Sequence, residues 1–306
     1  MANEVTYASV ADLRTAEALS AEFLMLLADR NALSNHPALV YAGQGNGLGS
    51  SVLKVPELGL MGYDLLAVTA DGSAVSNSAL TDGAATVTIA RYSKSYEPTD
   101  LALLTDPANG MIKPDAFAMD AIVSNASTLT SLIAIACGNF ATVAGSTGVD
   151  LTLANFLTAI ASLEIAKVVP PYLAVLHPVQ IGDLRSALST VGGAVQWMPA
   201  SAEQMAILGG GFRGTFMGVQ IFSSSHVATA NSGADRAGGM FGRGAIVWAD
   251  AAPPPAGDMN QLIIGGKVLF ERSRTAKSGL TAYVTHSYMG VSEGIDLAGV
   301  SVITDA

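Results

Sequence analysis

Two short stretches are the most informative about the fold: YLAVLHP at residues 172–178 and GTFMGVQIFSS at residues 214–224. A continuous apolar run of five residues is typical of a strand that is buried on both faces. We expect that strand at Tyr172–Leu176, a break at His177-Pro178, and a short helix from Val179 to Leu188. The second stretch predicts a strand pair or a bent strand. These elements indicate an α/β domain in the second half of the chain.

Toward the N-terminus the pattern becomes helical and then extended. Pro114-Asp115 opens the longest helical run, to about Phe140, because proline and an acid both suit a first helical turn. A helix of that length measures about 39 Å. Before it, β-branched alternation predicts strands at Ser51–Pro56 and Ala85–Tyr92. The insertion between them, residues 59–83, is long for a compact domain, and such insertions tend to be functional.

The remaining segments complete the expected element order. A capping box at Ser9–Asp12 predicts a helix to about residue 31, which is either a core helix or an arm that clasps another subunit. A second helix is expected at residues 151–167 and a further strand at Ala245–Trp248. From Lys267 the chain is strand-rich to its end. The fold class that follows is α+β.

Composition points to a subunit of an assembly. Of the 306 residues, 50% are hydrophobic and only 13% are charged, about half the usual charged share. Intrinsic disorder is excluded because it requires low hydrophobicity and high charge. The most apolar stretch, residues 121–149, begins with so many hydroxyl and amide side chains that we expect no membrane span. Burial against partner subunits explains the low charge.

Charge and cysteine content narrow the function further. The net charge is −10 and the basic residues are scattered singly, so we expect no strong direct binding of nucleic acid. The single cysteine, Cys137, excludes an intrachain disulfide, and we expect it to be a small core hydrophobe. The N-terminal residues lack the pattern of a secretory signal, which favours synthesis in a cytoplasm without export.

Three features of the sequence could indicate a catalytic or binding site, and each lacks the structural context that such a site requires. Gly209–Gly214 matches G-x-G-x-x-G, but a helix is expected before it and a strand after it, the reverse of a dinucleotide site. Ser51–Lys54 and Lys277–Gly279 resemble the S-x-x-K and K-T-G motifs of penicillin-recognising serine enzymes, but Ser51 lies in a strand pattern. The four histidines, at 36, 177, 226 and 286, are too far apart in sequence for a metal motif. We expect no catalytic, cofactor or metal site and no enzyme activity.

The order of parts resembles the major capsid proteins of tailed double-stranded DNA phages, the Hong Kong 97 fold family. The resemblance rests on Tyr172–Pro178 leading into a helix, on Gly214–Ser224, which looks like the family's glycine-valine strand ending in serines, and on Ala245–Ala249. It extends over nearly the whole chain. It implies an N-terminal arm, an extended two-stranded E-loop, a peripheral domain with a long spine helix and an α/β axial domain.

Within this resemblance the chain divides into five parts. They are an N-terminal arm and connector (residues 1–49), an E-loop (50–96), a peripheral domain with the spine helix (97–145), an axial domain (146–265), and returning strands (266–306). The E-loop is expected to contact a neighbouring subunit through Lys54, Leu60, Tyr63, Leu65 and Leu66. Glycines that could act as hinges between different positions in a shell are Gly43, Gly45, Gly47, Gly49, Gly145 and Gly148. Because Lys54 lies at the base of the excursion, we expect no crosslink there.

The implied function is a head protein that self-assembles, through hexamers and pentamers, into an icosahedral virion shell enclosing DNA. The shell would be assembled in the host cytoplasm. Portal, scaffolding and decoration proteins are possible partners. One alternative has the same fold, an encapsulin-like nanocompartment that holds enzyme cargo. The alternative from another class is a serine hydrolase of the penicillin-recognising type.

Overall fold

The computed structural model describes residues 33, 36–46, 50–58, 82–101, 114–191, 197–208, 211–254, 261–264 and 266–305. The helix expected at residues 9–31 and the insertion expected at 59–83 therefore lie almost entirely outside the described residues.

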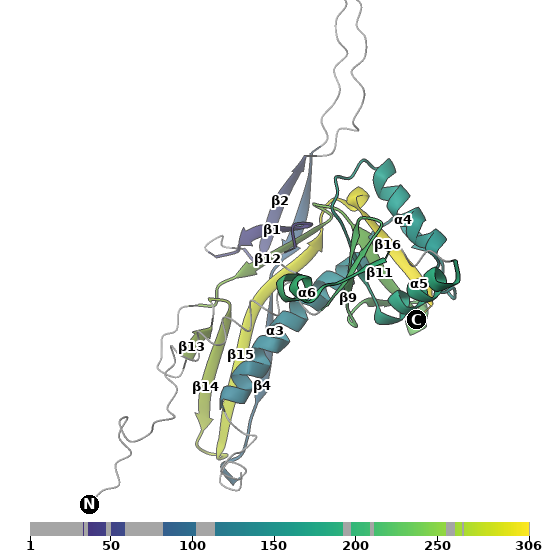
Figure 1. Cartoon of the computed structure of the whole chain (residues 1–306). Coiled ribbons are helices and arrows are strands. Elements are labelled where there is room, and N and C mark those ends of the chain that lie inside the picture. Colours follow the sequence, from purple (N-terminus) through teal and green to yellow (C-terminus); the bar gives the residue numbers. More distant parts are fainter. Residues whose placement is uncertain are drawn as a thin grey trace, which may run out of the picture. The chain divides into compact units, whose positions relative to one another are not determined.

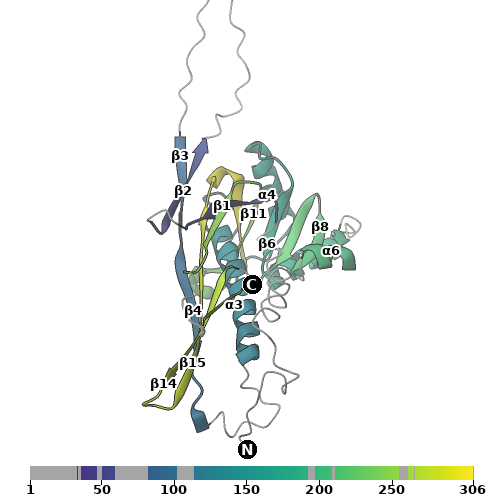
Figure 2. The same ribbon diagram turned by 90° about the vertical axis from the view of Figure 1, so that its left-hand side faces the viewer.

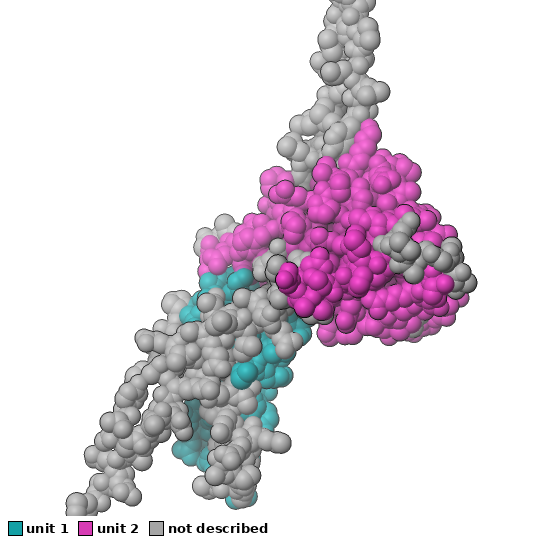
Figure 3. All heavy atoms as spheres, in the orientation of Figure 1, with its two compact units in different colours: residues 1–31, 91–127, 251–288 teal, residues 32–90, 128–250, 289–306 magenta. Residues whose placement is uncertain are grey.

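The described residues form two compact units (Figure 3). Unit 1 contains residues of Arg91–Ser127 and Ala251–Tyr288, and unit 2 those of Ala32–Ala90, Thr128–Asp250 and Met289–Ala306. The chain passes from one unit to the other several times. The long helix α3 and the long strand β15 have residues in both.

Unit 2 is built on an eight-stranded mixed sheet. Its strand order is β5-β16-β11-β6-β9-β8-β7, and β10 also pairs with β11. The strands are β5 (Val143–Gly145), β16 (Gly299–Asp305), β11 (Asp235–Phe241), β6 (Tyr172–Leu176), β9 (Val219–Ser223), β8 (Phe212–Phe216), β7 (Trp197–Pro199) and β10 (Ala228–Ala230).

The centre of this sheet confirms the strands expected from the two informative stretches. All five residues of β6 are buried, as the apolar run predicts for a central strand. The strand β6 pairs in parallel with β9, from Tyr172↔Val219 to Leu176↔Ser223. The second stretch is a strand pair, because β8 and β9 are antiparallel around a turn in which Met217 and Gly218 both have positive φ.

Three helices belong to the same unit: α4 (Leu153–Ile165), α5 (Pro178–Val191) and α6 (Ala202–Leu208) (Figure 1). The Thr152 side chain caps α4 by accepting a hydrogen bond from the Asn155 backbone N–H. The helices α4 and α5 bury one face each against the sheet. Side chains that share this core include Phe156, Leu163, Leu184, Phe216, Ile221 and Val302.

A two-stranded ribbon projects from unit 2 (Figure 2). The strands β2 (Val52–Leu58) and β3 (Asp82–Thr88) pair antiparallel from Val52↔Thr88 to Leu58↔Asp82. The base of the ribbon packs through Ala85 and Val87 on β1 (Leu39–Gln44) and β12 (Ile246–Ala251), which pair in parallel. An isolated hairpin is marginally stable in water, so this contact supports the ribbon.

The strand expected at Ala85–Tyr92 is in fact two strands. The first, β3, ends at Thr88, and β4 (Ala90–Tyr96) begins after Ile89. The chain changes partner here, because β3 pairs with β2 whereas β4 pairs with β15 (Leu280–Glu293). The backbone N–H of Ile89 donates to the Ser51 carbonyl and closes the ribbon at this point. The β-branched run ends at Ile89 and no glycine or proline separates it from β4, so no local turn signal marked the change.

Unit 1 is an antiparallel array beside the first half of α3 (Pro114–Ala136). The strand β14 (Val268–Thr275) pairs with β13 (Gln261–Ile264) and with β15. An aromatic stack runs through it, because the Phe117 ring lies 4.1 Å from that of Tyr96 and 5.6 Å from that of Tyr283.

The long helix α3 was predicted to reach Phe140 but ends at Ala136, after 23 residues, with a 3-10 turn at Cys137–Asn139. Its length is about 35 Å. By length and composition Met119–Asn139 is apolar enough to cross a membrane, and half of that segment is buried in the protein. The core helix of a globular protein has the same properties, which fits the expectation from its polar residues.

Two strands correct the expected layout of the second half. The strand at Ala245–Trp248 forms, as β12, but it pairs with β1 and not with the sheet that holds β6 and β9. The neighbour of β6 is instead β11, whose sequence DRAGGMF was not recognised as a strand. Two glycines and two charged residues within seven positions conceal its extended conformation.

Candidate functional site

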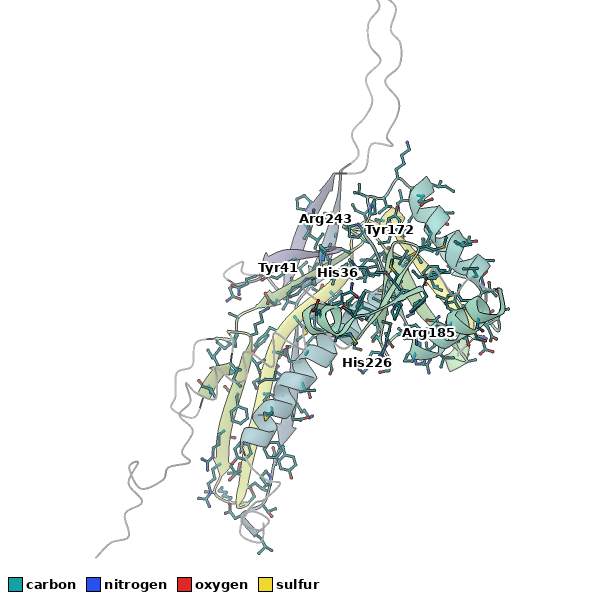
Figure 4. The ribbon with its side chains drawn as sticks, in the orientation of Figure 1. His36, Tyr41, Tyr172, Arg185, His226 and Arg243 are labelled. Carbon is teal, nitrogen blue, oxygen red and sulfur yellow. The ribbon has the colours of Figure 1, made fainter. Side chains whose placement is uncertain are left out.

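Two of the histidines, His36 and His177, occupy structural positions in the fold. His36 is buried, its Nε2 lies 2.6 Å from Gln220 Oε1, and its Nδ1 accepts from the Ala38 backbone N–H (Figure 4). Burial lowers the pKa of His36, so the imidazole is neutral at neutral pH. His177 follows the end of β6, as expected. Among the described residues no group of three histidine, cysteine, aspartate or glutamate side chains could hold a metal ion.

The two serine-enzyme motifs fall in unsuitable elements. Ser51 immediately precedes β2, whereas the nucleophile of a penicillin-recognising enzyme begins a helix. Lys277–Gly279 form the turn between β14 and β15. The structure also confirms the reversed order around the glycine run, since α6 precedes it and β8 follows. These motifs therefore have none of the local structure that their chemistry requires.

Cys137 is confirmed as a core residue. It is fully buried at the end of α3, and its thiol lies 3.1 Å from the Ile133 carbonyl oxygen. Burial raises the pKa of the thiol far above its ordinary value. The thiolate is the reactive form of cysteine. Because the Cys137 thiol is both protonated and buried, we expect it to react slowly.

We expect Cys137 in the native protein to react with a thiol-specific reagent at pH 8 at least about a hundred-fold more slowly than in the urea-unfolded protein. Quantifying the released chromophore over time measures both rates on the same sample. Equal rates would mean that the end of α3 opens freely. The unfolded protein is its own control, since it holds one thiol in each state.

The base of the ribbon places one predicted contact residue on its surface. Lys54 is exposed and lies opposite Thr86 on β3. On the other face, Leu53 and Val55 pack with Ala85 and Val87 toward β1 and β12. The remaining predicted contact residues, Leu60, Tyr63, Leu65 and Leu66, lie outside the described residues. The described part of the ribbon thus has one face packed and one face exposed.

The expected hinge glycines have different surroundings. Gly43 has a φ of +112° and open space around it. Gly45 is held by its backbone N–H, which donates to the Asp250 carbonyl. A Cβ on Gly145 would lie 2.3 Å from the Ile303 carbonyl oxygen, and Gly148 donates to Asp235 Oδ1. Gly47 and Gly49 lie outside the described residues. The hinge role stays a prediction.

A buried amide that sequence reasoning missed fixes α5 to the sheet. Gln180 is fully buried, and its Nε2 lies within 3.2 Å of the Arg236 and Val302 carbonyls and 2.8 Å from Thr304 Oγ1. Its Oε1 accepts from the His177 backbone N–H. All these partners are distant in sequence except His177, so no local pattern could have identified it.

Comparison with known proteins identifies the fold. No family model matches this chain. No curated protein matches it either. Solved structures do match. The cyanophage Pam1 capsid asymmetric unit has a TM-score of 0.56 at 13% identity, with 90% of this chain and 92% of that chain covered.

Two further structures agree. The holo-SrpI encapsulin complex from Synechococcus elongatus has a TM-score of 0.59 at 12% identity, with 90% of this chain and 86% of that chain covered. A structure of Mycobacterium phage Che8 has a TM-score of 0.56 at 16% identity, with 82% and 84% covered. The likeness shows the fold: the chain has the Hong Kong 97-like fold that its sequence predicted.

Proposed function

We propose that this chain is a major capsid protein, which self-assembles into an icosahedral shell around the double-stranded DNA of a tailed phage. The observation that carries the proposal is the likeness to phage capsid structures over most of both chains. The low charge supports it, because obligate interfaces are large and more apolar than transient ones. A net charge of −10 suits a container, since a wall that bound duplex tightly would hinder its entry.

The parts of the chain have proposed roles in the shell. Residues 1–49 form the arm, 50–96 the E-loop, 97–145 with 266–306 the peripheral region, and 146–265 the axial domain. The axial domains meet in hexamers and pentamers, and the E-loop lies on a neighbouring subunit with Lys54 at its base. The chain acts as a structural protein of the virion, not as an enzyme. It assembles in the host cytoplasm, with portal, scaffolding and decoration proteins as further partners.

An encapsulin-like nanocompartment is the second candidate, because an encapsulin complex is among the matching structures. The two candidates differ in what the shell encloses. Nuclease-resistant double-stranded DNA in particles from infected or induced cells supports the phage head. A co-purified enzyme without DNA supports the compartment.

Electron microscopy of the purified protein, with size-exclusion chromatography at two ionic strengths, tests the proposal. We expect closed shells of tens of nanometres, or rings of five and six subunits. A stable 31 kDa monomer at all concentrations would contradict it.

The ribbon offers a sharper variant for the same assay. Because Leu58 and Asp82 are the last paired residues, residues 59–81 can be replaced by Asn-Gly, a two-residue hairpin turn. We expect a folded, soluble subunit that no longer forms shells, since the excursion beyond the ribbon is the proposed contact to a neighbour. Replacing the turn Lys277–Gly279 by another turn sequence is the control. Normal shells from the shortened ribbon would remove the E-loop assignment.

A further inference from the structure

The imidazole of His36 joins the segment that leads into β1 to the eight-stranded sheet (Figure 4). Its Nδ1 accepts a hydrogen bond from the Ala38 backbone N–H, so the neutral ring carries its proton on Nε2. That nitrogen lies 2.6 Å from Oε1 of Gln220 on β9 and donates to it. Both ring nitrogens are therefore satisfied in one protonation state only, the neutral ring with its proton on Nε2.

The surroundings of the imidazole do not favour a positive charge. Within the described part of the chain His36 has no carboxylate partner, and the Phe222 ring lies 5.9 Å from its ring, edge to face. The strands that pair with β9 or β1 contain two charged residues, Arg213 on β8 and Asp250 on β12. Arg213 is exposed, and Asp250 accepts from the Tyr41 hydroxyl. Burial is the main cause of the lowered pKa of His36, and no charged side chain contributes.

Protonation of His36 would remove its hydrogen bond with Ala38. A proton on Nδ1 turns that nitrogen from an acceptor into a donor, which then faces the Ala38 backbone N–H. Ala38 is 1% exposed and His36 is 2% exposed, so water cannot replace the lost acceptor. A buried imidazolium without a carboxylate is itself costly. The arrangement is therefore stable only while the ring is neutral.

The strand β1 depends on side-chain contacts because its backbone pairing is limited. It is an edge strand with one neighbour, β12, and the register between them shifts between Tyr41 and Gln44. Two side chains fasten it to the rest of unit 2. His36 holds the segment that enters β1, and Tyr41 donates to Asp250 on β12.

A change in β1 would also affect the ribbon. Val40 and Ala42 on β1 pack in the same apolar cluster as Ala85 and Val87 at the base of the ribbon. An isolated hairpin is marginally stable in water, so the ribbon depends on this support. Loss of the contact at His36 would thus weaken the support on which the base of the ribbon rests.

We propose that His36 is a pH-sensitive latch, whose neutral imidazole holds the entry of β1 on the sheet beside the base of the ribbon and whose protonation in mild acid releases it. A released histidine has the ordinary pKa of about 6.5, whereas the latched ring binds a proton less readily. The latch is therefore at full strength above that pH and weakens as the pH falls. The inference concerns a single subunit, so it and the capsid proposal can fail independently.

Hydrogen–deuterium exchange of the purified full chain, as dissociated subunits, measures the latch. The readout is the protection of backbone amides in peptides that cover residues 36–44, corrected for the intrinsic pH dependence of exchange. We expect this protection to fall about ten-fold between pH 7.5 and pH 5.5, because the released state gains a proton over that range and the latched state does not. Peptides from β6 should keep their protection, which shows that the sheet stays folded. Unchanged protection at residues 36–44 would overturn the inference.

Two substitutions remove the titrating group while each keeps one hydrogen bond. The amide oxygen of His36→Asn can accept from Ala38, and the amide N–H of His36→Gln can donate to Gln220. In both variants we expect protection at residues 36–44 to change less than about two-fold between the two pH values. A ten-fold fall in these variants would show that another group controls the response, which also overturns the inference.

Gln220→Glu changes the electrostatics of the same contact without altering the histidine. A carboxylate beside Nε2 favours the imidazolium, so we expect the acid-induced fall in protection to shrink below about two-fold. If both His36 variants lose the protection of β6 already at pH 7.5, this variant decides alone. A full ten-fold fall in Gln220→Glu would then count against the latch.

Tyr41→Phe is the control for a general loosening of β1. It removes the other side-chain contact of the strand, and burial together with Asp250 raises the pKa of Tyr41 far above its ordinary value, so no group that titrates near pH 6 is lost. We expect lower protection at both pH values and the same ten-fold ratio between them. A ratio near one would mean that the response does not depend on His36.

His177→Gln is the matched histidine control. Burial lowers the pKa of His177 as well, but its Nδ1 accepts from the Val179 backbone N–H in the first turn of α5 and not from the entry to β1. We expect the response of the unmodified protein. Loss of the pH response in His177→Gln would assign it to the wrong histidine and overturn the inference.

Discussion

Replacing Gly239 by alanine is expected to lower the free energy of unfolding by about 1–3 kcal/mol. Gly239 lies within β11, between Val175 on β6 and Ser301 on β16. A Cβ there would lie 2.5 Å from the Cys137 carbonyl oxygen and 2.7 Å from its Cβ. Because backbone occupies the space, no side-chain rotation can relieve the clash. The sheet or the turn after α3 must move apart.

Gly182→Ala is the matched control, with the opposite expected sign. Gly182 lies within α5, and nothing lies within 4 Å of the position that its Cβ would take. Alanine favours a helix interior over glycine by about 0.5–1 kcal/mol, so this variant should be more stable than the unmodified protein. Urea denaturation of dissociated subunits measures both. A loss of stability in both variants, or in neither, would contradict the packing described for β11.

Local patterns predicted the elements whose conformation depends on neighbours in sequence. The five apolar residues of β6 required a buried strand, and Pro114-Asp115 marked the start of α3. Two strands on either side of an insertion were expected from their alternating runs, and they form as β2 and β3, whereas their register was not predicted. In these cases the local preferences of the sequence and the tertiary contacts favour the same conformation, so the prediction from local patterns was correct.

Which strands pair with each other could not be predicted from local patterns. Ile89 separates β3 from β4 because the two strands pair with different partners, and no turn residue in the sequence marks this position. Gly239 of β11 is needed because the turn at Cys137 approaches closely, a contact across about a hundred positions. The glycine can be read from the sequence, but the spatial neighbour that requires it, the backbone at Cys137, cannot.

The candidate contact surfaces were only partly visible before the structure. Low charge indicated buried subunit faces, but it did not show that Asp150 and Asp305 lie near Asp183, because the three are far apart along the chain. The Arg185 guanidinium lies over the Trp197 ring, a contact between α5 and β7 that no local pattern indicates. Such contacts can be predicted only when the strand order of the sheet is known, and no hydrophobic periodicity in the sequence predicts that order.

Phe156→Ala is expected to have the largest effect of any single core truncation considered, about 3–5 kcal/mol. The Phe156 side chain is fully buried in the interior face of α4, and its ring lies 5.4 Å from that of Phe216 on β8. Alanine would leave a cavity between the helix and the sheet. Since domains are stable by only about 5–15 kcal/mol, this loss is a large part of the total.

Leu157→Ala, one position further along α4, separates core packing from surface contact. Leu157 is 38% exposed, so its truncation should cost the dissociated subunit less than about 1 kcal/mol in urea denaturation. If Leu157→Ala destabilised the subunit as much as Phe156→Ala, the face of α4 that packs on the sheet would be assigned wrongly. The expected result is a stable subunit in one case and an unstable one in the other, because successive helical positions point about 100° apart and only one faces the core.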